Sequence, residues 1–224
     1  SAAAAADRAS AATSRAAAAA SRAAAAITTA STAITAAATS TAVSAIPAAT
    51  FSTIVVVAAA GQPLPLLPAD VIVAHDQRES RGPLEGIAAG MLALHKQSEA
   101  GQRDLVDAVY VTSCDVPLLH TRFIRYMIDQ LGERDEIAVP RCERFHHPLA
   151  AVYRPNVLPP MQRLLSDDLL RPIYLFDQLR TREVAVDTLR DVDPELAALE
   201  NVNTPGQYLS ALERCGFEPP PGMI

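Results

Sequence analysis

The sequence predicts a doubly wound α/β fold, in which helices cover both faces of a mostly parallel sheet. Short runs of β-branched residues recur along the chain, separated by segments whose apolar residues have helical spacing; this alternation is typical of parallel sheets. The main runs are apolar throughout, as in strands that are buried on both faces. The chain has 224 residues, and we expect one domain over 51–215 and a tail over 216–224.

The first predicted elements surround a proline-rich loop. Residues 53–58 form a continuous β-branched run and are predicted to be a buried strand. Three prolines within 61–68 exclude regular structure there. A short strand over 71–74 leads into Asp76, and Pro83 then suits the first turn of a helix whose apolar spacing continues to residue 95.

The later elements follow from the same patterns. Residues 109–112 are a β-branched and aromatic run that stops at Asp115, because Pro117 prevents the strand from continuing. The remaining predictions are a helix over 121–131, a strand over 136–139, a turn and strand over 147–153, helices over 154–165 and 169–179, a strand over 183–187 and a helix over 205–214.

Composition narrows the possible functions. The net charge of −6 argues against a nucleic-acid-binding protein that works through a basic face. The three cysteines are widely spaced, so they indicate neither a disulfide framework nor a zinc site, and a reducing cytoplasm is expected. No apolar run reaches the length of a membrane span. We therefore expect a soluble, cytoplasmic protein.

Residues 1–50 differ sharply from the rest of the chain. They are mostly Ala, Ser and Thr, contain no Gly or Lys, and carry three arginines against the single acid Asp7. Three interpretations are open: a low-complexity extension, an organelle-targeting peptide, or letters that do not report the true side chains, as a frame error would produce. A sheet that began at residue 53 would lack its first strand and helix, so we expect 1–50 to occupy that structural place.

Asp115 is the first candidate for a functional residue. It follows a predicted central strand, and ligands of open α/β sheets bind beyond the carboxyl ends of the strands. A single carboxylate beside phosphates suits Mg²⁺, which takes one or two protein carboxylates and completes its shell with phosphate and water oxygens. The alternative is that Asp115 caps the following helix.

Four landmarks occur in a fixed order along the chain, namely Asp76 followed by Gly-Pro-Leu-Glu-Gly at 82–86, Cys-Asp-Val-Pro-Leu at 114–118, His-Pro-Leu at 147–149, and Asn-Val-Asn-Thr-Pro at 201–205. Together they resemble the molybdenum cofactor guanylyltransferase family, within the nucleotidyltransferases of Rossmann-like fold. The resemblance covers roughly residues 53–212. It implies transfer of GMP from GTP to molybdopterin, with release of pyrophosphate and formation of the guanine dinucleotide cofactor.

The resemblance also implies roles for individual residues. Asp115 matches the Mg²⁺-binding and GTP-contacting aspartate, which makes it the expected metal ligand and catalytic residue. Further nucleotide contacts are expected at Asp76, Gly82, Pro83 and Leu84, and candidate acceptor contacts are His147, Asn201 and Asn203. His147 can instead be a plain turn residue, and the two asparagines can instead be a helix cap and its turn.

One departure from the family pattern concerns the phosphates. The family opens with a glycine-rich loop and a lysine around the triphosphate, whereas the equivalent place here has neither. Ser21 and Arg22 are the only residues there that match the loop, and they are the nucleotide contacts that the resemblance implies for this segment. Two further hypotheses therefore stay open: transfer of a cytidylyl or other nucleotidyl group to a small phosphorylated acceptor, and a degenerate accessory protein that binds molybdopterin without catalysis. Besides GTP and molybdopterin, the expected partners are molybdoenzymes or other cofactor-biosynthesis proteins; neither nucleic acid nor membrane is expected.

Overall fold

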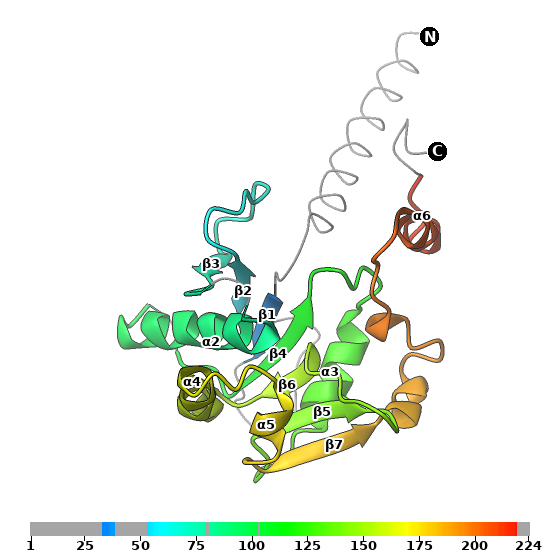
Figure 1. Cartoon of the computed structure of the whole chain (residues 1–224). Coiled ribbons are helices and arrows are strands. Elements are labelled where there is room, and N and C mark those ends of the chain that lie inside the picture. Colours follow the sequence, from blue (N-terminus) through cyan, green and yellow to red (C-terminus); the bar gives the residue numbers. More distant parts are fainter. Residues whose placement is uncertain (1–32, 39–52, 79–80, 103, 219–224) are drawn as a thin grey trace.

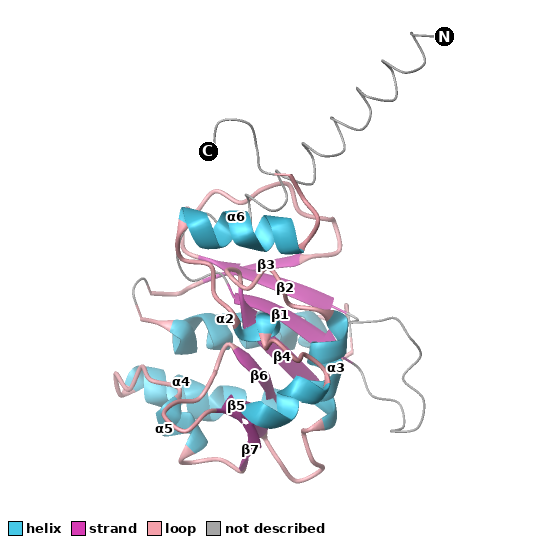
Figure 2. Ribbon diagram, turned by 90° about the vertical axis from the view of Figure 1, so that its right-hand side faces the viewer, coloured by secondary structure: helices cyan, strands magenta, loops and turns pink. Residues whose placement is uncertain are grey.

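The structure is a computed structural model that describes residues 33–38, 53–78, 81–102 and 104–218. Its strands form one seven-stranded sheet in the order β3-β2-β1-β4-β6-β5-β7, which Figure 2 shows from top to bottom. The strands are β1 (Ala33–Ala38), β2 (Thr53–Ala58), β3 (Ile72–His75), β4 (Ala108–Ser113), β5 (Ile137–Arg141), β6 (Ala150–Tyr153) and β7 (Thr181–Ala185).

Most of the strands share one direction. β2 pairs with β3 and β5 with β7 in parallel, whereas β1 and β6 are each antiparallel to both of their neighbours. Consequently β2, β3, β4, β5 and β7 all point the same way, which confirms the predicted mostly parallel α/β sheet. The reversal of β6 has a simple cause: its connection from β5, over residues 142–149, is too short for the crossover that parallel neighbours require.

Helices cover both faces of the sheet, as predicted (Figure 1). They are α2 (Pro83–Glu99), α3 (Thr121–Asp129), α4 (Leu158–Ser166), α5 (Ile173–Phe176) and α6 (Pro205–Arg214). On one face α2, α4 and α5 bury a cluster that includes Val55, Leu84, Met161 and Leu175. On the other, α3 packs Phe123 and Met127 against Tyr110 and Val152. Among the described helices, none has both the length and the apolar character needed to cross a bilayer.

Two sequence predictions need correction. The helix expected over 169–179 is reduced to the four residues of α5, because Pro172 disfavours helical backbone at the residue before it and so prevents an earlier start. The strand expected over 183–187 begins at Thr181, and Val186–Asp191 form a 3-10 helix instead of continuing the strand.

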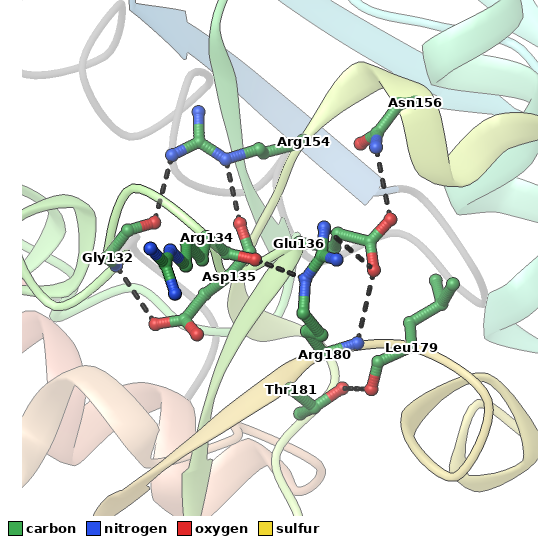
Figure 3. Close-up of polar contacts among 9 residues, drawn as sticks. All are labelled: Gly132, Arg134, Asp135, Glu136, Arg154, Asn156, Leu179, Arg180 and Thr181. Atoms are coloured by element: carbon green, nitrogen blue, oxygen red, sulfur yellow. Dashed lines mark hydrogen bonds and ion pairs between the residues drawn. The ribbon is translucent and has the colours of Figure 1, made fainter.

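A polar network fixes the amino-terminal edge of the sheet (Figure 3). Arg154 donates to the carbonyls of Asp135 (2.8 Å) and Gly132 (3.0 Å), just before β5 begins. The Glu136 carboxylate accepts from the backbone N–H of Arg180 at 3.1 Å, just before β7. These contacts join side chains to backbone groups across two strand starts, and they hold the edge opposite to the candidate site.

Candidate active site

The predicted site residues follow strands that end at one edge of the sheet. In the pairing of β4 with β6, Thr112 lies opposite Ala150. Asp115 comes three residues after Thr112 and His147 three residues before Ala150, so both lie beyond the same ends of neighbouring strands. Asp76 follows β3 at this edge, three strand positions from β4, or roughly 14 Å at about 4.8 Å per strand.

Asp115 is held from one side only. Asn201 donates through Nδ2 to Asp115 Oδ2 at 2.8 Å, and the N–H of Val202 donates to the Asp115 carbonyl at 2.8 Å. The second carboxylate oxygen, Oδ1, is shielded from solvent and has no hydrogen-bond partner in the described part of the chain. Buried polar atoms are nearly always paired, so an unpaired carboxylate oxygen beyond a strand end is the atom of this site best suited to an incoming ligand.

Neither Asp115 nor Asn201 serves as a helix cap. The cap of α3 is His120, whose Nδ1 accepts from the Phe123 N–H at 3.2 Å. The cap of α6 is Thr204, which forms a capping box with Gln207. The alternative that Asp115 and Asn201 only cap helices therefore does not apply. The hydrogen bond between their side chains needs another explanation.

Asn203 belongs to the turn before α6 and not to the Asp115 contact. Its backbone N–H donates to Gln207 Oε1 at 2.8 Å, and its side chain is exposed. The observed contact of Asn203 is therefore that of a residue in the turn before the last helix, which is the alternative to acceptor binding.

The donor set decides which kind of cation fits. Among the described residues, no three or more His, Cys, Asp or Glu side chains gather as a metal-binding group. This excludes from that part of the chain a site made of three or four such side chains, as structural zinc needs. A divalent cation that takes one carboxylate oxygen and completes its shell with ligand and water oxygens is compatible with Asp115 Oδ1.

Asp76 is a second carboxylate with an unpaired oxygen. Its backbone N–H donates to the Ala58 carbonyl at 3.0 Å, while Oδ1 is buried and unpartnered in the described chain. Burial, and after it the negative charge of Glu85, raise the pKa of Asp76, and nearby His75 opposes this shift. A Cβ added to Gly86 would lie 3.6 Å from Oδ1, so the first turn of α2 backs this carboxylate closely.

The Gly-Pro-Leu segment starts α2 beside Asp76. Gly82 has φ +73° and ψ −169°, a backbone region that is essentially restricted to glycine, and Pro83 occupies the first turn. The Leu84 side chain is fully buried in the core, so only its backbone can contact a nucleotide. The segment thus presents backbone, rather than side chains, at the carboxyl edge.

His147 lies in the connection between β5 and β6. Its backbone N–H donates to the Pro140 carbonyl at 2.9 Å, and its ring lies 5.0 Å from that of Phe145, centroid to centroid. Burial, and then the neighbouring His146, lower the pKa of His147. The imidazole is therefore biased towards its neutral form, which can donate one hydrogen bond but carries no charge to attract a phosphate.

Two predicted site residues have no described position, and one group of charged residues was not predicted. Ser21 and Arg22 lie outside the described residues. Sequence reasoning missed Arg81, Glu85 and Asp168, which form an ion-pair group between α2 and α4. A charged residue before Gly82 was visible in the sequence, but nothing local indicates a partner 87 positions further along the chain.

The chain is similar to known proteins in both sequence and structure. The family model described as the MobA-like NTP transferase domain matches residues 36–182. A molybdenum cofactor guanylyltransferase from Desulfosudis oleivorans is 30% identical over 145 residues, covering 65% of this chain and 67% of that protein. A probable molybdenum cofactor guanylyltransferase from Mycobacterium avium is 33% identical, covering 67% of this chain and 68% of that protein.

One further relative is covered less fully. The match to a probable molybdenum cofactor guanylyltransferase from Methanosarcina acetivorans, at 31% identity, covers 58% of this chain and 54% of that protein. Among solved structures, molybdopterin-guanine dinucleotide biosynthesis protein A from Archaeoglobus fulgidus superposes with a TM-score of 0.52 at 21% identity, over 65% of this chain and 69% of that chain. This likeness supports the fold assignment alone.

Proposed function

The chain belongs to the family of MobA-like NTP transferase domains, and from this premise we propose that it transfers GMP from GTP to the terminal phosphate of molybdopterin. The names of its relatives support this choice of reaction. In the reaction an acceptor phosphate oxygen bonds to the α-phosphorus of GTP, the bond from that phosphorus to the bridging oxygen breaks, and pyrophosphate leaves. The product is a dinucleotide that carries molybdopterin and guanosine.

One observation carries the assignment of the catalytic residue: Asp115 has one oxygen fixed by Asn201 and the other buried without a partner. We propose that Asp115 Oδ1 is the protein ligand of a Mg²⁺ ion that also binds GTP. When bound, this ion supplies charge neutralisation at the α-phosphate and the leaving pyrophosphate. Asn201 contributes by holding Oδ2, which fixes the direction in which Oδ1 points.

The other site residues bind and orient the substrates. Asp76 and the backbone at Gly82 lie towards the β3 side of the edge, and in this proposal they contact the nucleotide. His147 lies on the β6 side and in this proposal meets the acceptor, as does the exposed side chain of Asn203, whose backbone N–H makes the turn contact before α6. An acceptor phosphate is already anionic near neutral pH, so the reaction demands positioning and charge stabilisation rather than a protein base. The neutral bias of His147 is consistent with this division of roles.

The test is pyrophosphate release with GTP or CTP, with and without molybdopterin, and with and without Mg²⁺. Release with GTP that requires both the acceptor and Mg²⁺ supports the proposal. A preference for CTP keeps the reaction class but changes the nucleotide. Absence of release with either nucleotide, from protein that is folded, contradicts the proposed activity.

A second candidate function is favoured by one observation. Residues 1–50 hold neither Gly nor Lys, although backbone N–H groups of a glycine-rich loop and a lysine are the usual means of holding a triphosphate. With these side chains, the protein would bind molybdopterin without transferring a nucleotide. The intact mass tests whether residues 1–50 have these side chains. Agreement with 23.7 kDa supports this second function, whereas a heavier chain of equal length contradicts it.

A further inference from the structure

Arg81 is a largely buried cation at the start of α2. Its side chain is 15% exposed. Nη1 donates to Asp168 Oδ1 at 2.8 Å, Nη2 donates to the Leu165 carbonyl, and Nε lies 3.7 Å from Glu85 Oε2. The two Nη groups of the guanidinium fork therefore donate hydrogen bonds to Asp168 and Leu165, as a lysine could not do with one nitrogen. Glu85 lies within ion-pair distance only, because Nε has no hydrogen-bond partner in the described chain.

Two of these groups belong to the carboxyl-terminal end of α4. The Leu165 carbonyl lies in the last turn of the helix, where a cation complements the helix dipole. Asp168 follows the helix with φ +58°, and its N–H donates to the Leu165 carbonyl at 3.3 Å. Arg81 thus joins the start of α2 to the end of α4, and these two helices pack side by side on one face of the sheet (Figure 1).

The third group is a buried acid. The Glu85 side chain is 8% exposed, and Arg81 is its ion-pair partner. Glu85 also lines a groove of about 280 Å³ between α2 and α4, whose other lining residues include Gln77, Ala89 and Gln162. A buried carboxylate needs a compensating charge. Loss of the Arg81 charge would leave Glu85 without that compensation in the first turn of α2.

That first turn is the part of α2 that meets the nucleotide residues. Gly82 follows Arg81 directly, and Gly86 lies against Asp76 Oδ1. The position of this turn therefore sets both the backbone at Gly82 and the surface behind Asp76. A shift of the turn relative to the sheet would move these two contacts together, while Asp115, which follows β4, would stay in place.

We propose that Arg81 is a positioning residue for nucleotide binding, which acts by fastening the first turn of α2 to the end of α4 through Asp168 and the Leu165 carbonyl. This inference rests on the proposed function in one respect, namely that Asp76 and Gly82 contact the nucleotide. It predicts that loss of Arg81 weakens the binding of GTP and leaves the chemical step at Asp115 nearly unchanged.

The first experiment compares matched substitutions in steady-state kinetics. Arg81→Gln is expected to raise KM for GTP about tenfold with kcat within about twofold, since only interactions that bind substrate and transition state equally are lost. Arg81→Lys should recover part of this loss, because an ammonium keeps the charge but not the fork. Asp168→Asn should raise KM only about two- to threefold, since the Asp168 carboxylate is mostly exposed.

The controls remove similar charges nearby. Arg163→Gln removes an exposed arginine from α4, and Asp167→Asn removes the exposed carboxylate next to Asp168. Both should leave KM and kcat at the wild-type values. The proposal would be overturned if Arg163→Gln raised KM as much as Arg81→Gln, or Asp167→Asn as much as Asp168→Asn. The loss of any charge near α4 would then explain the effect.

The second experiment measures the contact without any substrate. Hydrogen exchange of the amides in the first turns of α2 should quicken several-fold in Arg81→Gln, while amides of β4 keep their wild-type rates. Unchanged exchange rates refute the contact itself. A large fall of kcat that accompanies the rise in KM refutes the claim that Arg81 affects only nucleotide binding. A wild-type protein that binds no GTP refutes the proposed function and the nucleotide part of this inference, and the exchange result distinguishes that failure from loss of the contact.

Discussion

Replacing Asp115 by asparagine separates catalysis from folding more cleanly than any other change at the site. The substitution keeps the shape of the side chain and an oxygen that can accept from Asn201, but it removes the negative charge. We expect pyrophosphate release to fall by about 10²–10³-fold, the range found when one group that stabilises transition-state charge is removed. This corresponds to about 3–4 kcal/mol of activation free energy.

The cost to stability should be much smaller. Asp115 accepts one side-chain hydrogen bond, at 2.8 Å, and its Oδ1 has no partner in the described chain. Weakening that one bond costs about 1 kcal/mol, and the neutral amide is easier to bury than the carboxylate, which offsets part of the loss. The free energy of unfolding should therefore change by about 1 kcal/mol or less.

The assay is GTP-dependent pyrophosphate release at saturating acceptor over a range of Mg²⁺ concentrations, together with urea unfolding of the same preparations. Asp129→Asn is the control, since Asp129 is an exposed carboxylate at the end of α3, and it should behave as the wild type. Turnover of Asp115→Asn within tenfold of the wild type would refute the assignment. An Asp115→Asn variant that is unfolded would instead refute the predicted small effect on stability.

Three further predictions concern stability and pH. Asp76→Asn should raise the free energy of unfolding at pH 7 and weaken GTP binding. Because the folded state raises the pKa of Asp76, the ionised carboxylate destabilises the fold at pH values above that pKa. This destabilisation is absent below the ordinary pKa of 3.8, where the carboxyl group is protonated in both states. Urea unfolding at pH 7 and pH 3 tests the sign, and equal effects at both would contradict it. Gly82→Ala should cost roughly 1–3 kcal/mol in thermal unfolding, because its backbone, with φ +73° and ψ −169°, lies in a region essentially restricted to glycine. Gly206→Ala, in a helix with open space around it, should cost nothing. Finally, the lowered pKa of His147 means that stability declines as pH falls below about 6.5, and His147→Gln should flatten this decline in a series of unfolding curves; an unchanged slope would assign it to other groups.

Local patterns predicted most of the fold because the central strands are continuous runs of apolar, mainly β-branched residues. The run over β2 is buried except at Ile54, and β4 is buried up to its last residue, so continuous β-branched residues identified both. The direction of β6 was missed although the short connection before it carries the information. The length of α5 was missed because helical apolar spacing continues past the point where Pro172 limits the helix.

The site was predictable by residue but not by contact. Asp115 and Asn201 were both identified, the second only through family resemblance, yet their hydrogen bond spans 86 positions and no local pattern encodes it. The Arg81 group was missed for the same reason, since its partners lie on α4. Charged side chains on loops and helix ends obtain their partners from the tertiary fold, so a local sequence pattern can indicate such a residue but not the residue that it contacts.

The most direct test of the central claim is a crystal structure with GTP and Mn²⁺ in place of Mg²⁺, in which the anomalous signal locates the metal. We predict a metal peak about 2.1 Å from Asp115 Oδ1 that also contacts phosphate oxygens of GTP, with Asn201 still bonded to Oδ2. A metal and nucleotide bound away from Asp115, or an Oδ1 that remains without a ligand in the occupied protein, would contradict the account.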